Sequence, residues 1–483
     1  VRSNVDINSK EIEEVVKAVR SSMGQITNKT SGASEGSFNQ PQSVAAGVFH
    51  ELDDAVSAAR NAATELRSVA MRDKVIAAIR QAGVAHAKEL AELAVQETGM
   101  GRVDDKTAKN ILQSEGTPGT ECLRPEVVTG DNGLTLIEHA PWRVIASVTP
   151  STNPAATVIN NSISMIAAGS AVVFAPHPAA KQVSQRAITI LNEAVIAAGG
   201  PANLMVTVAN PNIETAQRLF KYPGIGLLVV TGGDAVVESA RKHTDKRLIA
   251  AGAGNPPVVV DETANIENAA KSIVFGASFD NNIICADEKV LIVVDSVADQ
   301  LIEAMKRHKA YQLTGEQAKQ LEPVLLTKVD ESGHGIVSRD WVGRDATKIA
   351  AAIGVQAPAD TRLLIVETSM SHPFAVTELM MPVLPIIRVK NVDEAISLAV
   401  KLEAGCHHTA AMHSTNLDNL DKMANAIDTS IFVKNGPCIA GLGFGGEGWT
   451  TMTITTPTGE GVTNARTFVR LRRCVLAGNF RIV

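Results

Sequence analysis

The feature that most constrains the fold is a repeated alternation of short apolar runs with Ala-rich segments of helical pattern. From Arg143 onwards the strand-like runs are VIASVT, SAVVFA, LMVTVA, GLLVVT and PPVVVD. A second series, which reaches about residue 435, consists of KVLIVV, VLLTKV, RLLIVET, PVLPIIRV, TAAMHS and SIFVKN. This alternation is typical of repeated βαβ units, whose strands pair in parallel. The pattern therefore predicts an α/β fold with two doubly wound domains.

Further segments lie outside the two series. Ala-rich helical patterns fill residues 45–115. The segments PEVVTGDNGLTLIEHAP (125–141) and TFVRLRRCVLAGNFRIV (467–483) have strand patterns, and we expect them to form a small β ribbon that joins subunits into a homo-oligomer, a dimer or a tetramer. Residues 1–24 place apolar side chains on one helical face, which predicts an amphipathic helix. Residues 25–44 are rich in Ser, Gly, Asn and Gln and should form a flexible linker.

Composition excludes several classes of function. The net charge is -6 and the pI is near 6.0, so there is no basic footprint for nucleic acid. No apolar run reaches the ~18 residues that span a bilayer, so no membrane segment is expected. The five cysteines are an odd number without C-x-x-C spacing, which favours a reducing, cytoplasmic location without a zinc site. They are Cys122, Cys285, Cys406, Cys438 and Cys474.

Two strand-to-helix turns have the character of nucleotide-binding turns. In VVTGGDAVVESARKH, Thr231, Gly232 and Gly233 lie between a strand and a helix start, where backbone N–H groups suit a pyrophosphate. In FAPHPAAK, Pro176 and His177 follow another strand at the edge where nucleotides bind. Each motif is weak alone, because a Gly-Gly pair also makes an ordinary turn and His177 suits an exposed loop.

Asn153 and Cys285 are the candidate catalytic residues. Asn153, in TPSTNPAAT, ends a strand, and its NH2 group is the kind of donor that stabilises an oxyanion; the alternative is a side chain that only shapes a turn. Cys285, in SFDNNIICADEKV, precedes an apolar run and is either a small core residue or a nucleophile. His407 and His408 are adjacent, would point apart on a strand and lack a carboxylate at ligand spacing, so we expect no metal site.

The order of these motifs resembles the aldehyde dehydrogenase superfamily from about residue 45 to the end of the sequence. The similarity is strongest to its CoA-acylating branch, the propionaldehyde and acetaldehyde dehydrogenases of bacterial propanediol and ethanolamine utilisation. TNPAATVINNSISMIAAGSAVVFAPHPAAK and GLGFGGEGWTTMTITTPTGEGVTNARTFVRLRRC carry the resemblance over long runs. It implies oxidation of a short aldehyde to acyl-CoA with NAD and CoA, with propanal as the expected aldehyde and acetaldehyde as the alternative.

The resemblance also implies roles for single residues. Cys285 corresponds to the nucleophile, Asn153 to the oxyanion donor, and Glu378 of ELMMPV to the carboxylate that holds the nicotinamide ribose. Thr231, Gly232 and Gly233 correspond to the turn over the cofactor phosphates, while Pro176 and His177 border the adenosine site. On this basis we expect a dinucleotide-binding domain at 45–252, with residues 120–140 contributing to the ribbon. A catalytic domain at 253–445 and a return segment with the rest of the ribbon at 446–483 should follow.

Two departures from the family pattern are informative. Where hydrolytic members carry E-L-G-G-K-S-P, this chain has Ala251-Gly252-Ala253-Gly254-Asn255-Pro256-Pro257, so the glutamate that would activate water is absent. A thioester on Cys285 should therefore await a thiol, which argues against the alternative of a hydrolytic enzyme that releases free acid. Ala175 and Pro178 replace the usual lysine and acid near His177, so ribose recognition should differ in detail from the family pattern, and NADP is the alternative to NAD.

Enzymes of this branch often carry a tethered N-terminal helix as an encapsulation peptide. The resemblance therefore implies that residues 1–24 bind a shell protein and place the enzyme in the lumen of a bacterial microcompartment. One alternative is a helix that packs on its own subunit or caps the oligomer. An alternative of another class is a catalytically idle, shell-associated scaffold, against which the joint presence of Cys285, Asn153 and Glu378 argues.

Overall fold

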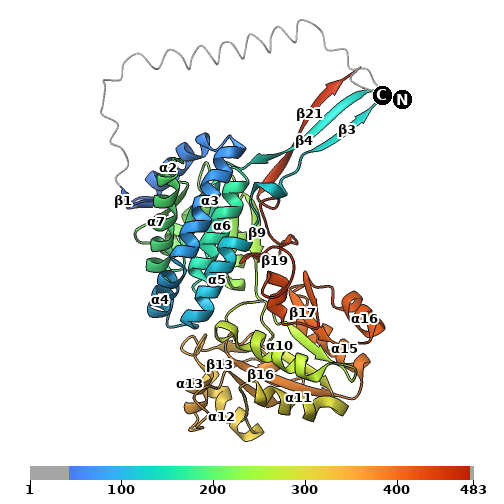
Figure 1. The fold of residues 1–483 in the computed structure, drawn as a ribbon. Helices are drawn as coiled ribbons and strands as arrows, with labels where there is room; N and C mark the ends of the chain where they lie inside the picture. The colour runs from blue at the N-terminus through green and yellow to red at the C-terminus, as the bar shows by residue number, and fades with distance from the viewer. Residues whose placement is uncertain (1–42, 479–483) are drawn as a thin grey trace, which may run out of the picture. The chain divides into compact units, whose positions relative to one another are not determined.

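The computed structural model describes residues 43–478. The predicted helix over residues 1–24 and residues 25–42 of the predicted linker lie outside this range. None of the helices between residues 43 and 478 is both long and apolar enough to cross a bilayer. The predicted class is confirmed, because the chain forms two mostly parallel sheets flanked by helices, with a separate three-stranded ribbon (Figure 1).

The first sheet has the strand order β1-β2-β7-β6-β5-β8-β9 and is parallel except for the β1–β2 pair. The chain runs from β5 through β6 to β7 on one side and to β8 and β9 on the other. The order therefore reverses at β5, and the carboxyl edge beside such a reversal is where ligands bind in open α/β sheets. The strands are β1 Ser43–Ala45, β2 Val48–Phe49, β5 Val144–Thr149, β6 Ala171–Pro176, β7 Met205–Val208, β8 Leu227–Thr231 and β9 Arg247–Ala251.

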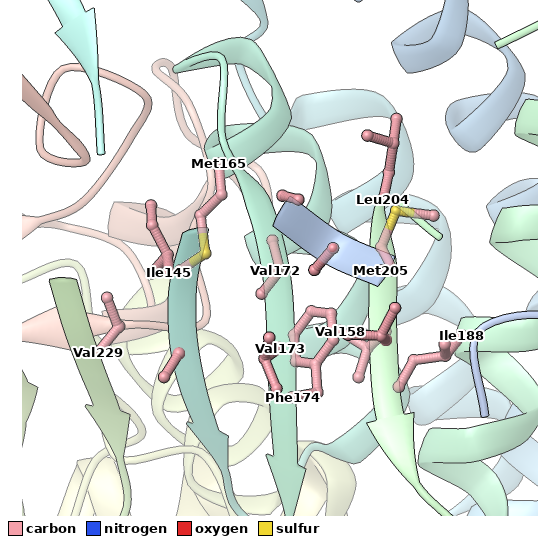
Figure 2. Close-up of a cluster of buried hydrophobic side chains, with 14 of the residues drawn as sticks. Ile145, Val158, Met165, Val172, Val173, Phe174, Ile188, Leu204, Met205 and Val229 are labelled. Atoms are coloured by element: carbon pink, nitrogen blue, oxygen red, sulfur yellow. The ribbon is translucent and has the colours of Figure 1, made fainter. Parts of the chain in front are cut away.

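Helices pack on both faces of the first sheet and enclose a core of branched and small side chains. Figure 2 shows Val158 and Met165 of one helix beside Ile145 and Phe174 of the sheet, and all of these side chains are buried. Every residue of α6 is buried, as expected for a helix between the sheet and a further helical layer. The helices are α2 Leu52–Glu65, α3 Val69–Ala85, α4 Ala87–Thr98, α5 Val103–Gly116, α6 Pro154–Ala167, α7 Lys181–Ala197, α8 Ile213–Lys221 and α9 Asp234–His243, with short 3-10 turns η1 Thr120–Cys122 and η2 Pro178–Ala180.

The second sheet has the order β12-β15-β16-β11-β10-β17-β18, and all its strands are parallel. Its strands are β10 Pro257–Val260, β11 Val290–Val294, β12 Ala310–Gln312, β15 Leu363–Glu367, β16 Val383–Val389, β17 Thr409–His413 and β18 Ile431–Lys434. Its helices are α10 Ile266–Ser278, α11 Asp295–Arg307, α12 Gly315–Leu325, α13 Ala346–Ala351, α14 Pro373–Val376, α15 Val392–Glu403 and α16 Leu417–Ile427, with 3-10 turns η3 Phe279–Asn282 and η4 Cys438–Leu442.

Three of the predicted elements were wrong. The apolar series groups PPVVVD (256–261) with the first sheet, whereas the expected domain bounds place it in the catalytic domain. β10 belongs to the second sheet, because periodicity alone cannot tell which sheet a buried run joins. VLLTKV is not a strand of the second sheet. Its first two residues end α12, and the rest form β13 (Leu326–Val329), which pairs with β14 (Gly335–Val337) in a separate hairpin. Residues 327–329 of this hairpin are exposed. The helical prediction over 45–115 fails at its start, where β2 pairs with β7.

The remaining strands form the ribbon and a small hairpin. β3 (Glu126–Gly130), β4 (Gly133–Pro141) and β21 (Val469–Ala477) pair antiparallel in the order β21-β4-β3, so both predicted strand segments are confirmed. Their role in oligomer formation stays a prediction. Between η4 and β21, the strands β19 (Ile454–Thr455) and β20 (Gly461–Val462) pair with each other, and this return segment bonds to α6 through Asn160 and Asn161.

Candidate active site

Asn153 lies at the carboxyl edge of the first sheet, against the turn that leads to Cys285. It is the N-cap residue of α6, yet its side chain makes no capping hydrogen bond. Its Nδ2 instead donates to the carbonyl oxygen of Ile283 at 3.3 Å and to Oγ1 of Thr152 at 3.2 Å. Both distances are at the long end for N–H···O bonds, so a better acceptor would displace them at little cost. The structure thus brings the two predicted catalytic residues to one place.

Cys285 lies between η3 and β11 and packs against an apolar cluster that includes Phe279, Ile284 and Leu442. Burial, and then the carboxylate of Glu378, raise the pKa of its thiol to about 12. Among residues 43–478, the backbone N–H of Cys285 has no acceptor in another residue. It lies against the sulfur of the same residue, and this contact acts to lower the pKa of the thiol. The sulfur is therefore protonated at neutral pH, and the N–H is available to a substrate oxygen beside the sulfur.

Three consecutive residues before Cys285 have left-handed backbone conformations. Asp280, Asn281 and Asn282 have φ of 46°, 57° and 63°. Such conformations are unfavourable outside glycine and persist where the surroundings hold them. The side chain of Asn281 donates to the carbonyl oxygen of Gly343 at 2.9 Å, and that of Asn282 donates to the carbonyl oxygens of Ala277 (2.9 Å) and Glu288 (3.0 Å). The strained turn is thus anchored at each residue.

The carboxylate of Asp280 is the centre of a buried charge cluster that sequence reasoning missed. It accepts hydrogen bonds from Lys106 Nζ at 3.0 Å and from Lys109 Nζ, both on α5, and from the backbone N–H of Arg102 at 2.7 Å. Gly101 permits this approach, since a Cβ there would lie 2.1 Å from Asp280 Oδ1. In the sequence, lysines three residues apart on a helix resemble an exposed face, so no signal marked them as buried.

A second group of buried charges follows Cys285 closely in the sequence. Asp287, Glu288 and Lys289 are each at most 3% exposed. The ammonium of Lys289 donates to the carbonyl oxygens of Asn282 (3.2 Å) and Ile284 (2.8 Å), and it acts to lower the pKa of Cys285. Burial raises the pKa of Glu288 to about 7 and that of Asp287 well above its ordinary range. These residues therefore brace the Cys285 loop and set its electrostatic surroundings.

Glu378 follows α14 and faces the same region. Burial raises the pKa of its carboxyl to about 7, while Lys289 acts in the opposite direction. Within residues 43–478, its Oε1 is buried and has no hydrogen-bond partner. An unpartnered carboxylate oxygen is an acceptor for the hydroxyl groups of a ribose, so this residue fits its predicted role.

The turn of Thr231, Gly232 and Gly233 joins β8 to α9. Gly233 is the N-cap of α9 without a side-chain cap, and a Cβ there would meet no atom within 4 Å. The space beside Gly233 is therefore open, and the first backbone N–H groups of a helix lack partners within the helix, so the turn fits a phosphate. The carboxylate of Asp234 raises the pKa of Glu378, so the turn and Glu378 are electrostatic neighbours. The hydroxyl of Thr231 is buried and forms a hydrogen bond with Oγ1 of Thr453 at 3.0 Å, so its side chain anchors the turn to the return segment.

Pro176 and His177 lie at the end of β6, on the other side of β5. Pro176 is buried, whereas His177 is exposed and its Nδ1 accepts a hydrogen bond from the backbone N–H of Ala179 at 3.1 Å. His177 thus caps η2. Since β6 and β8 both flank β5, the two predicted nucleotide turns lie on the same edge of the sheet. Together with Glu378, the residues at this edge fit a dinucleotide.

The segment from Ala251 to Pro257 contributes no carboxylate to the site. Its Asn255 is buried, and Nδ2 donates to the carbonyl oxygens of Ala375 and Leu402, both at 3.0 Å. A Cβ on Gly254 would lie 2.8 Å from the ring of His408, so that ring covers the segment. The segment is therefore a structural support, and it holds no group that could activate water.

The prediction that His407 and His408 lie on a strand was wrong. Both precede β17, and His407 has a left-handed φ of 52°. Burial lowers the pKa of His408 to about 3, while His407 is exposed.

Cys438 has a structural role near the site, because its backbone N–H donates to Oε1 of Glu288 at 2.8 Å.

The sequence of this chain is similar to the sequences of known enzymes. Residues 39–454 match the model of the aldehyde dehydrogenase family. The chain is 73% identical over 477 residues to acetaldehyde dehydrogenase (acetylating) EutE of Salmonella typhimurium, covering 99% of this chain and 100% of that relative. It is 45% identical over 439 residues to propanal dehydrogenase (CoA-propanoylating) of Citrobacter freundii, covering 90% and 94%.

Solved structures show the same similarity. A propionaldehyde dehydrogenase from the Clostridium phytofermentans fucose utilisation bacterial microcompartment has a TM-score of 0.87 at 43% identity, over 91% of this chain and 100% of that one. Rhodopseudomonas palustris propionaldehyde dehydrogenase with bound CoA and an acylated cysteine has a TM-score of 0.86 at 45% identity, over 89% and 98%. The chain belongs to the aldehyde dehydrogenase family. Within the family it is an enzyme of the CoA-acylating branch, as its sequence motifs predicted.

Proposed function

We propose that the enzyme converts acetaldehyde, CoA and NAD to acetyl-CoA and NADH through a thioester on Cys285. The observation that supports the mechanism is the hydrogen bond from the Asn153 amide to the carbonyl oxygen of Ile283, two residues before Cys285. Acetaldehyde is favoured over the expected propanal, since identity is 73% to an acetylating relative and 45% to a propanoylating one. Propanal remains the second candidate substrate.

The residues of the site support the following steps. The Cys285 thiol loses its proton to solvent as its sulfur attacks the aldehyde carbon, and the resulting oxyanion accepts hydrogen bonds from Asn153 Nδ2 and the Cys285 N–H. A bound NAD would supply the hydride acceptor that turns the adduct into a thioester. Glu378 would hold its ribose, the Thr231-Gly232-Gly233 turn its phosphates, and the β6 edge its adenosine.

The second half-reaction is transfer of the acyl group between two thiols. The sulfur of CoA attacks the thioester carbon, the bond to Cys285 breaks, and the thiol proton of CoA returns to the Cys285 side, so no oxidant or water is consumed. The residues from Ala251 to Pro257 offer no carboxylate to activate water, which supports thiol transfer over hydrolysis. Since a thioester is exchanged for a thioester, the reaction should be reversible.

One cradle for an adenine nucleotide diphosphate is apparent in the described residues, at the edge formed by β6, β5 and β8. NAD and CoA both carry such a group, so we propose that they occupy this edge in turn while the acyl group waits on Cys285. This order gives ping-pong kinetics.

We further propose that the enzyme is a homo-oligomer that joins through the β3-β4-β21 ribbon and works in the lumen of a bacterial microcompartment. Val127, Val128, Leu471 and Val475 are each more than half exposed on the ribbon, which supports its role as a contact surface. One structural relative comes from a microcompartment of fucose utilisation. Residues 1–24 are the proposed contact with the shell.

The test is NADH production from acetaldehyde and from propanal, each with and without CoA. We expect CoA-dependent NADH formation, a higher kcat/KM for acetaldehyde, and acetyl-CoA as the product. Cys285→Ser is the matched control, because it keeps the shape of the side chain and removes the thiolate. Sustained NADH formation without CoA would instead indicate a hydrolytic enzyme, and inactivity of the pure protein with both aldehydes would favour a scaffold.

A further inference from the structure

Lys109 contacts the Asn153 amide on the side away from Cys285. Its ammonium donates to Oδ1 of Asn153 and to Oδ2 of Asp280, and its side chain is 1% exposed. An ammonium group has no acceptor, so only the oxygen of the amide can face it. The NH2 group must then face Ile283 and the Cys285 loop, where Nδ2 donates to the Ile283 carbonyl oxygen. Lys109 therefore determines which end of the amide points toward the substrate.

The cluster around Lys109 contains two buried lysines that are hydrogen-bonded to one carboxylate. Lys106 and Lys109 share the single carboxylate of Asp280, and their side chains are 4% and 1% exposed. The nearby carboxylate of Asp105 is already paired with Arg362 at 2.8 Å. Burial lowers the pKa of Lys106 to about 8, and Lys109 acts in the same direction, as expected for two close cations. A buried cation bonded to an amide oxygen polarises the amide and strengthens its N–H donors.

The same ammonium links the oxyanion donor to the nucleophile. Asp280 belongs to the left-handed turn that leads to Cys285, whereas Asn153 belongs to the first sheet and α6. Lys109 bonds to both, so one group holds the turn and the amide at a fixed separation. Lys106 bonds to the same carboxylate and to the carbonyl oxygen of Thr152 at 2.9 Å, but it does not touch the Asn153 side chain.

We propose that Lys109 is a positioning residue for the reaction, which orients and polarises the Asn153 amide so that it binds the oxyanion formed on attack by Cys285. The proposal rests on the role of Asn153 proposed above. It predicts that Lys109 acts on turnover only through Asn153. Loss of Lys109 should therefore matter much less once the Asn153 amide is gone.

The test is a double-mutant cycle with Lys109→Met and Asn153→Ala, read as kcat and aldehyde KM in the presence of NAD and CoA. Asn153→Ala should lower kcat by ~100-fold. Lys109→Met should lower kcat by about 10- to 100-fold with KM changed less than about threefold, as expected when a transition-state contact is weakened. The double variant should be within about threefold of Asn153→Ala alone.

Lys106→Met is the matched control, since it removes a buried lysine from the same carboxylate. Its effect on kcat, whatever its size, should multiply with that of Asn153→Ala. If the Lys109 and Asn153 effects also multiply, Lys109 acts independently and the proposal is wrong. If Asn153→Ala keeps wild-type kcat, the oxyanion assignment fails and the role of Lys109 fails with it. If Lys109→Met does not fold, Lys109→Gln keeps a donor of similar length and should show a smaller loss that is equally absent in the Asn153→Ala background.

Discussion

Replacing the buried carboxyl group of Glu288 by an amide should remove a pH dependence from the stability of the enzyme. Burial raises its pKa from 4.5 to about 7, because an ionised carboxylate loses its hydration there. The stability that this group contributes is present below pH about 4.5 and is lost as pH rises through about 7. The rise in pKa corresponds to about 3 kcal/mol. Glu288→Gln does not ionise and keeps an Oε1 to accept from the Cys438 N–H, so it should escape this loss.

The assay is the midpoint of thermal unfolding of both proteins between pH 5 and pH 9 at constant ionic strength. Relative to the wild type, the midpoint of Glu288→Gln should rise by about 3 °C across pH 5 to 8, since about 1 kcal/mol corresponds to about 1 °C for a chain of this size. Glu316→Gln is the control, because its side chain is 82% exposed and its curve should run parallel to the wild type. A parallel curve for Glu288→Gln as well would refute the reasoning and leave Glu288 with an ordinary pKa.

Further perturbations test the nucleophile, its electrostatic neighbour, the nucleotide edge and the N-terminal segment. Cys285→Ala should abolish aldehyde oxidation at a stability cost of at most ~1 to 2 kcal/mol, and wild-type turnover would exclude Cys285 as nucleophile. Glu378→Gln should speed iodoacetamide alkylation of Cys285 at pH 9 by about three- to tenfold, measured by mass spectrometry, because its carboxylate raises the pKa of the thiol; an unchanged rate would contradict that coupling. Varying CoA at several NAD concentrations should give parallel double-reciprocal lines, and intersecting lines would indicate a second nucleotide site. Deleting residues 1–24 should leave the kinetics of the soluble enzyme nearly unchanged but release it from shell particles. Unaltered co-purification of the truncated enzyme with shells would contradict the proposed shell contact.

Much of the architecture could be predicted because parallel strands buried on both faces appear as continuous apolar runs. That signal located β5, β6 and β8, whose ends carry the candidate site. It could not assign PPVVVD to a sheet, since partner choice depends on contacts distant in the sequence. The helical prediction from residue 45 failed for the same reason, because β2 is stabilised by pairing with β7.

The candidate site was predictable where chemistry is tied to residue type and order. Cys285, Asn153 and Glu378 were chosen as candidates in this way, and the structure brings Asn153 against the Cys285 turn with Glu378 as an electrostatic neighbour of the thiol. The supporting charges could not be found. Lys109 is a lysine in an ordinary helical pattern, and only the tertiary fold shows that it is buried against Asp280.

The ion pairs of Asp280 also limit how the enzyme can exchange NADH for CoA. They tie the turn before Cys285 to Lys106 and Lys109 on α5, so they join segments that flank the two different sheets. Separating a buried carboxylate from its cations costs about 3 to 5 kcal/mol. A hinge motion that opened this junction would be populated about 1% of the time or less. If the two nucleotides exchange in turn as proposed, departure of one and entry of the next should proceed by local shifts at the rim, while this junction stays closed over Cys285.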